Sequence, residues 1–151
     1  MKNIAYNKVT KFMAILIGLL VSTSVLAQNG NVREETARQV GLNFLRLKDG
    51  SPRSDLQLTR VDAVQYPNLY VYNTSENGFI VVASDNRMEP ILAYSDEGTF
   101  DKDNVAPGAN FWFEMYEYAI DSIVRNNVRD VDEKITRKWE DLINGIMPEL
   151  Q

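Results

Sequence analysis

The residue types that carry most nucleophilic and metal chemistry are missing from this 151-residue chain, which contains neither cysteine nor histidine. A serine or threonine nucleophile is usually activated by a neighbouring base, most often histidine, so only lysine or a carboxylate could take that part here. Structural zinc sites are built from cysteine and histidine. The composition therefore argues against cysteine, serine–histidine and histidine–metal catalysis. We expect a protein that is not an enzyme and that holds no metal or other cofactor.

Acidic clusters are the remaining candidates for ligand binding. Asp101, Asp103 and Asn104 resemble the start of an EF-hand loop. However, Val105 stands where that loop requires an oxygen ligand, and Ala106 stands where it requires glycine. Short patterns of this kind match readily by chance. A solvated acidic loop is therefore favoured over a calcium site.

The N-terminus has the layout of a secretory signal peptide. Three lysines precede an unbroken apolar run over residues 12–21, and the small residue Ala27 offers a cleavage site. The run is shorter than the ~20 apolar residues that a membrane-spanning helix needs. We expect residues 1–27 to be removed and residues 28–151 to form one domain that is secreted or periplasmic, with no membrane contact after cleavage.

The charge of the mature chain narrows the class of partner. Loss of the three lysines leaves 13 basic residues against 21 acidic ones, a net charge of −8. That net charge argues against binding to nucleic acid, which needs a basic surface, and against adsorption to anionic lipid. It also disfavours self-association, so we expect a monomer when the protein is free.

Hydrophobic periodicity predicts a helix, then strands, then two further helices. Asn31 and Glu34 have capping-box spacing at the start of the first helix. Residues 56–100 have the pattern of short strands, with Asn77-Gly78 as a turn signal. The run Phe79–Ala83 is continuously apolar, as in a strand that is covered on both faces. Sequential strands with tight turns imply an antiparallel meander of four to five strands.

The two C-terminal helices are placed by their apolar positions. Residues 111–126 carry a broad apolar face at Phe111, Met115, Tyr118, Ala119 and Ser122. Asp130 and Glu133 have capping-box spacing before the last helix, whose apolar seam is Val131, Ile135, Trp139, Leu142 and Ile146. The fold class is therefore α+β, with the helices packed on one face of the sheet. Phe44, Val81 and Trp139 are predicted to be buried.

One stretch carries a family resemblance. Its segments combine aromatic, β-branched and turn residues at fixed spacing: Leu69–Asn73, Gly78–Arg87, Pro90–Ser95 and Gly98–Asp101. In spacing and residue type they resemble the propeptide of the streptopain-type cysteine peptidases and the stand-alone Spi inhibitors. The resemblance covers roughly residues 33–126.

The resemblance implies an inhibitor. In the peptidases a papain-like domain with the Cys–His pair follows the propeptide, whereas this sequence ends at Gln151, about where that domain would begin. We therefore expect residues 28–151 to be a Spi-type inhibitor domain without its enzyme. It would bind a streptopain-like cysteine peptidase and occlude the active-site cleft in trans.

The same resemblance singles out Asn110. It aligns this residue with the asparagine of the streptopain propeptide that precedes a helix, reaches the catalytic cleft and disturbs the Cys–His pairing. A carboxamide is uncharged and both donates and accepts hydrogen bonds, so it enters a cleft without the desolvation penalty of a charge. Pro107 and Gly108 would shape the loop before it, and Phe111 and Trp112 would anchor it by packing. Alternatively, Asn110 caps the helix, because asparagine is among the preferred N-caps; the two roles are compatible.

Two other functions stay open at this point. The domain could be an envelope binding module unrelated to proteolysis, since small α+β folds host many functions. It could also be the remnant of a truncated peptidase precursor. A neighbouring gene for a streptopain-like peptidase favours the inhibitor, whereas in-frame catalytic-domain sequence just downstream favours the remnant.

Overall fold

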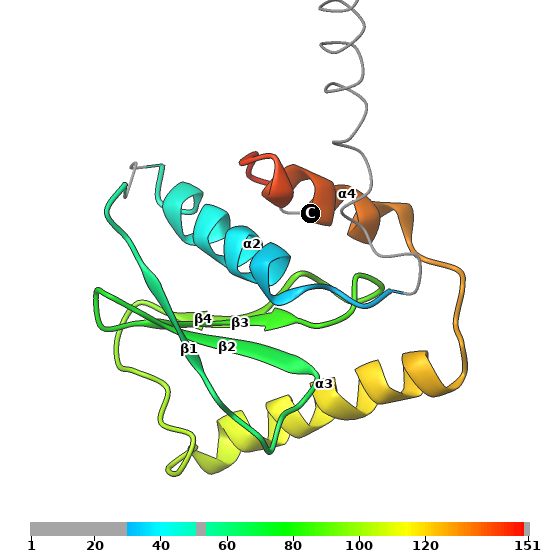
Figure 1. The fold of residues 1–151 in the computed structure, drawn as a ribbon, viewed down its shortest axis with the longest axis horizontal. Helices are drawn as coiled ribbons and strands as arrows, with labels where there is room; N and C mark the ends of the chain where they lie inside the picture. The colour runs from blue at the N-terminus through cyan, green and yellow to red at the C-terminus, as the bar shows by residue number, and fades with distance from the viewer. Residues whose placement is uncertain (1–29, 51–53, 150–151) are drawn as a thin grey trace, which may run out of the picture.

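A computed structural model describes residues 30–50 and 54–149 as a helix, a four-stranded sheet and two further helices (Figure 1). The predicted signal peptide lies outside the described residues. The elements are α2 (Glu34–Leu47), β1 (Leu58–Val61), β2 (Leu69–Thr74), β3 (Phe79–Ala83), β4 (Ile91–Ser95), α3 (Pro107–Arg125) and α4 (Glu133–Ile143). This order confirms the predicted α+β class. None of the helices within the described part of the chain is long and apolar enough to cross a membrane.

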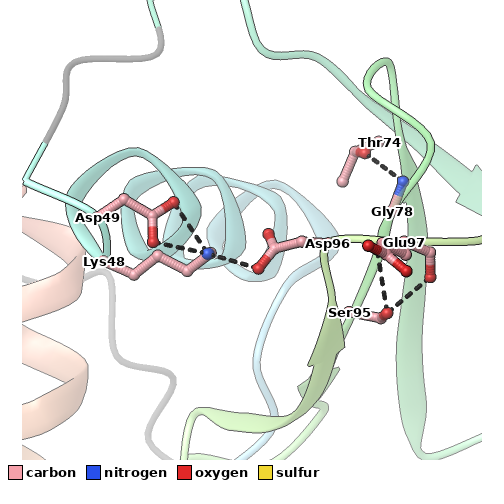
Figure 2. Close-up of polar contacts among 7 residues, drawn as sticks. All are labelled: Lys48, Asp49, Thr74, Gly78, Ser95, Asp96 and Glu97. Carbon is pink, nitrogen blue, oxygen red and sulfur yellow. Dashed lines mark hydrogen bonds and ion pairs between the residues drawn. The ribbon is translucent and has the colours of Figure 1, made fainter.

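The sheet is an antiparallel meander in the order β1-β2-β3-β4. The turn between β2 and β3 needs the predicted Asn77-Gly78, because Asn77 has a φ of 62°. A side chain at Gly78 would bring its Cβ within 2.4 Å of the Ser95 carbonyl oxygen. Figure 2 shows how the Thr74 hydroxyl closes this turn by accepting a hydrogen bond from the Gly78 N–H at 2.9 Å.

One face of the sheet packs against α2, which in turn holds α4 (Figure 1). Gly41 allows the close approach, since a Cβ there would lie 3.2 Å from Val82 Cγ2. The Asn43 amide donates to the Leu142 carbonyl at 2.7 Å and so satisfies one of the free carbonyls at the end of α4. Trp139 and Val81 are fully buried, as predicted, whereas Phe44 is only half-buried.

The opposite face of the sheet is covered by α3, which lies on the other side from α2 and α4 (Figure 1). Phe100 forms the layer between them, with its ring centroid 5.9 Å from that of Phe79 and 5.7 Å from that of Phe113. The Asn73 side chain holds Phe100 in place by bonding both its N–H, at 2.7 Å, and its carbonyl, at 3.1 Å. The helices therefore divide between two faces, not one as expected. This explains why β3 is apolar throughout.

Two predicted caps are displaced in the structure. Arg33, not Asn31, is the N-cap of α2, and it makes no side-chain capping bond. Asn31 instead forms an antiparallel bridge with Asp85. At α4 the cap is Asp132, whose carboxylate accepts from the Lys134 N–H at 2.8 Å.

An ion-pair cluster ties the end of α2 to the turn after β4. The Lys48 ammonium lies 2.9 Å from the Asp49 carboxylate and 2.8 Å from that of Asp96 (Figure 2). Burial lowers the pKa of Lys48, but its bonds to Asp96 and Asp49 outweigh that effect, and the net result is a raised pKa. The cluster fixes α2 against the β4 end of the sheet.

Candidate functional site

The candidate site is the first turn of α3, which begins earlier than the sequence pattern indicates. The helix starts at Pro107, and its N-cap is Ala106, which makes no side-chain bond. Proline suits this first position because its missing N–H would have no partner there and its φ is already helical. Asn110 is therefore inside the helix, where its N–H donates to the Ala106 carbonyl at 2.9 Å. The capping role considered for Asn110 is wrong.

The Asn110 carboxamide is held at both ends. The Tyr66 hydroxyl donates to its oxygen, and its nitrogen donates to Glu114 Oε1 at 2.7 Å. Tyr66 comes from the β1–β2 connection, so the contact joins segments that are 44 residues apart in the sequence. Asn110 itself is half-buried, between this contact and solvent.

Tyr66 is a rigid support because its ring is enclosed. It is 2% exposed and makes edge-to-face contacts with Phe113 and Phe100, with centroids 5.4 Å and 6.5 Å away. Burial raises the pKa of the Tyr66 phenol, and the carboxylates of Glu114 and Glu117 raise it further. The hydroxyl therefore keeps its proton, and remains a donor to Asn110, through the neutral range.

A second polar contact fastens α3 about two turns beyond Asn110. Glu117 accepts hydrogen bonds from the N–H of Asn68 at 2.7 Å and from its side-chain nitrogen at 2.8 Å. Burial raises the pKa of the Glu117 carboxyl, against the opposing effect of these two bonds. Phe113, Glu117 and Ile120 thus form the inward face of α3, at i, i+4 and i+7.

The outward face of α3 carries an apolar stripe that includes three residues of the apolar face indicated by the sequence pattern. Phe111, Trp112, Met115 and Tyr118 are 57%, 55%, 48% and 71% exposed. The rings of Phe111 and Trp112 contact edge to face at 5.8 Å, and Trp112 lies 6.5 Å from Tyr116. The apolar face that the periodicity indicates is therefore exposed at Phe111, Met115 and Tyr118. The sequence did indicate an exposed apolar surface, because α3 contains more apolar residues than a single buried face can accommodate.

All five predicted contact residues lie within the first six residues of α3. Pro107 and Gly108 are exposed and helical, not part of a loop as expected. A Cβ at Gly108 would meet nothing within 4 Å, so this end of the helix opens onto solvent. Residues that sequence reasoning missed are Tyr66 and Glu114, which hold Asn110, and the exposed Met115 and Tyr118.

The described residues offer little for metal chemistry. Across residues 30–50 and 54–149, no group of three or more acidic side chains is placed to hold a metal ion. Asp101 and Asp103 instead bond within their own turn, where the Asp103 N–H donates to the Asp101 carboxylate at 3.0 Å. The arrangement at α3 is suited to contact with another protein: a stripe of exposed aromatic side chains beside one oriented carboxamide.

Comparison with known proteins identifies the family. The chain is 34% identical to streptopain of Streptococcus pyogenes over 101 residues, in a match that covers 59% of this chain and 25% of streptopain. It is 25% identical over 143 residues to the thiol protease/hemagglutinin PrtT of Porphyromonas gingivalis, covering 89% of this chain and 16% of that protein. The chain thus spans a quarter or less of the length of these relatives. Residues 29–120, more than half of the chain, match the model of the Spi protease inhibitors, and this chain belongs to that family.

Proposed function

We propose that this chain inhibits a thiol protease of the streptopain type by laying the start of α3 across the active-site cleft. The observation that carries the proposal is the exposed aromatic stripe of Phe111, Trp112, Met115 and Tyr118 directly beside Asn110. Monomeric proteins seldom expose contiguous large apolar side chains unless a partner covers them. The family match and the similarity to streptopain and to the thiol protease/hemagglutinin PrtT support a protease as that partner.

The composition of the stripe suits a protein interface. Tryptophan, tyrosine, phenylalanine and methionine are enriched at the buried centres of such interfaces. A stable complex buries ~800 Å² on each partner, so the loops that flank the start of α3 would have to contribute as well.

The helical backbone explains how such an inhibitor would escape cleavage. From Asn110 onward the amides of α3 are bonded within the helix, beginning with the bond to the Ala106 carbonyl. A protease cuts a segment whose backbone is free to meet the catalytic groups. A hydrogen-bonded helix occupies the cleft without presenting a scissile bond in reach.

The proposal includes the setting in which the inhibitor acts. Residues 1–27 would direct export, and residues 28–151 would be the inhibitor domain, present as a monomer outside the cytoplasm. The net charge of −8 in that domain opposes self-association until the partner covers the stripe.

An inhibition assay tests the proposal. We would measure the inhibition constant of the chain against the mature thiol protease parts of streptopain and of PrtT, using a fluorogenic peptide. We expect inhibition, and we expect Asn110→Ala to weaken it roughly tenfold or more, the effect of losing a central interface residue. Ile146→Ala is the control, because Ile146 is an exposed apolar residue that follows α4, the helix on the other side of the sheet from α3.

The outcomes separate two parts of the proposal. If neither protease is slowed at micromolar chain, the inhibitor function is wrong. If both are slowed but Asn110→Ala matches the parent, inhibition does not depend on this residue and the role of Asn110 is wrong.

A further inference from the structure

The two bonds made by Asn110 fix which end of its carboxamide points where. A carboxylate can only accept hydrogen bonds, so Glu114 requires the amide nitrogen on its side. The Tyr66 hydroxyl can donate or accept, and here it donates to the amide oxygen. Rotating the carboxamide by half a turn would place its oxygen against the Glu114 carboxylate, an arrangement of two acceptors with no proton between them.

The carboxamide can nevertheless form further hydrogen bonds. Its nitrogen has two hydrogens and its oxygen two lone pairs, and each atom uses one of these on Glu114 or Tyr66. One N–H and one lone pair are left. Because Asn110 is half-buried and lies beside exposed Phe111, a bound partner could reach both of them.

We infer that Tyr66 and Glu114 are positioning residues, which hold the Asn110 carboxamide in a single orientation so that it presents one donor and one acceptor to the partner. This inference rests on the proposed function for the identity of the partner. The orientation of the Asn110 carboxamide is independent of that function, because Tyr66 and Glu114 fix it in the free protein.

Orientation before binding has a measurable value. Binding is weakened for each side chain that loses conformational freedom when the complex forms. A side chain that is already fixed in the free protein avoids this loss. Removing one support should therefore weaken inhibition roughly 3- to 10-fold, while direct contacts of Asn110 remain possible.

The supports differ in how they can be removed. Tyr66 is buried, so Tyr66→Phe deletes only the hydroxyl and keeps the ring contacts with Phe113 and Phe100. Glu114 is exposed, so Glu114→Ala removes the carboxylate without a cavity. Tyr70→Phe is the matched control for the first variant, because it deletes a hydroxyl that donates to the Val32 carbonyl at 2.8 Å. Glu140→Ala, at an exposed position in α4, matches the second.

The first test is a double-mutant cycle on the full chain, expressed with its own N-terminal region, against mature streptopain and the thiol protease part of PrtT. We expect Tyr66→Phe to weaken inhibition 3- to 10-fold in the parent, and to have no further effect in an Asn110→Ala background. Equal weakening in both backgrounds would overturn the inference, because Tyr66 would then act through the fold and not through Asn110. No weakening by Tyr66→Phe where Asn110→Ala does weaken inhibition would also overturn it.

The second test needs no protease. Nitrogen-15 relaxation of the Asn110 side-chain amide in the free chain reports its motion on the picosecond to nanosecond timescale. We expect a rigid amide in the parent, in Tyr70→Phe and in Glu140→Ala, and a mobile one in the Tyr66→Phe, Glu114→Ala double variant. A mobile amide in the parent, or an equally rigid one in the double variant, contradicts the positioning role. An Asn110→Ala variant that inhibits like the parent would instead contradict the proposed role of Asn110.

Discussion

Single buried residues hold the helices of this domain to the sheet, and Trp139 is the largest of them. Its ring is fully buried under α4, and its indole N–H donates to the Met88 carbonyl at 2.9 Å. One side chain thus supplies both apolar contact and the partner of a carbonyl in the β3–β4 connection.

Trp139→Ala should therefore be severely destabilising. Truncating a buried aromatic residue to alanine costs ~3–5 kcal/mol, a large part of the stability of a small domain. Tyr118→Ala is the control, and at its exposed position we expect less than ~0.5 kcal/mol. Urea unfolding followed by circular dichroism measures both. Similar midpoints for the two variants would show that the assigned core is wrong.

Other residue roles were out of reach of the sequence because they depend on neighbours far along the chain. Asn110 has the residue type of a cap, but its partners Tyr66 and Glu114 assign it a different role. The structure also changes which substitution is informative. Asn110→Asp, which would have preserved a cap, puts a second carboxylate beside Glu114 at i,i+4, a like-charge pair that destabilises helices. Asn110→Ala is the cleaner probe.

At the scale of elements, α3 packs with the opposite face from the one that its periodicity favours. The apolar residues of α3 are distributed around its whole circumference, so two different stripes fit a helical repeat. Contact of Phe113 with Phe100 and Tyr66 decides which stripe faces the sheet. The order of helix, four strands and two helices was predictable, since each element has strong periodicity or clear turn residues. The placement of α3 on the far face of the sheet was not, because nothing local in the sequence specifies it.

The seating of α3 through Glu117 should depend on pH. Burial raises the pKa of this carboxyl above its ordinary 4.5, so the folded protein binds the proton more readily than the unfolded chain does. The contribution of Glu117 to stability therefore increases as the pH falls from neutrality toward 4.5. We expect the stability of the parent, relative to Glu117→Gln, to improve over that range in urea unfolding. A constant difference between the two proteins, or a change in the opposite sense, would show that this carboxyl does not behave as described.

On the scale of the whole molecule, the helices on the two faces of the sheet differ in how much apolar surface they bury. The face under α2 and α4 holds the large buried side chains Trp139, Leu142 and Leu45. The other face carries α3, which covers the sheet with Phe113 and Ile120 and leaves its aromatic stripe to solvent. Surface and core can therefore be changed independently.

Gly108→Gln exploits this independence. A side chain there enters open space, and replacing a glycine that has a helical backbone conformation improves stability by up to about 1 kcal/mol, because the unfolded chain loses conformational entropy. The same side chain would stand in the way of a partner that docks at the start of α3. We expect a higher unfolding midpoint together with a weaker inhibition of streptopain or PrtT. A variant that is more stable and inhibits as well as the parent would place the docking surface elsewhere.

The central claim is that the start of α3 covers the catalytic centre of a thiol protease, and chemical protection of the catalytic cysteine tests it most directly. Mature streptopain and the protease part of PrtT would be treated with iodoacetamide, alone and with saturating chain, and alkylation of the cysteine followed by mass spectrometry. Occlusion predicts that the parent chain and Ile146→Ala slow alkylation strongly, and that Gly108→Gln at the same concentration slows it less. A complex that forms, yet leaves the cysteine as reactive as in the free protease, would contradict the claim.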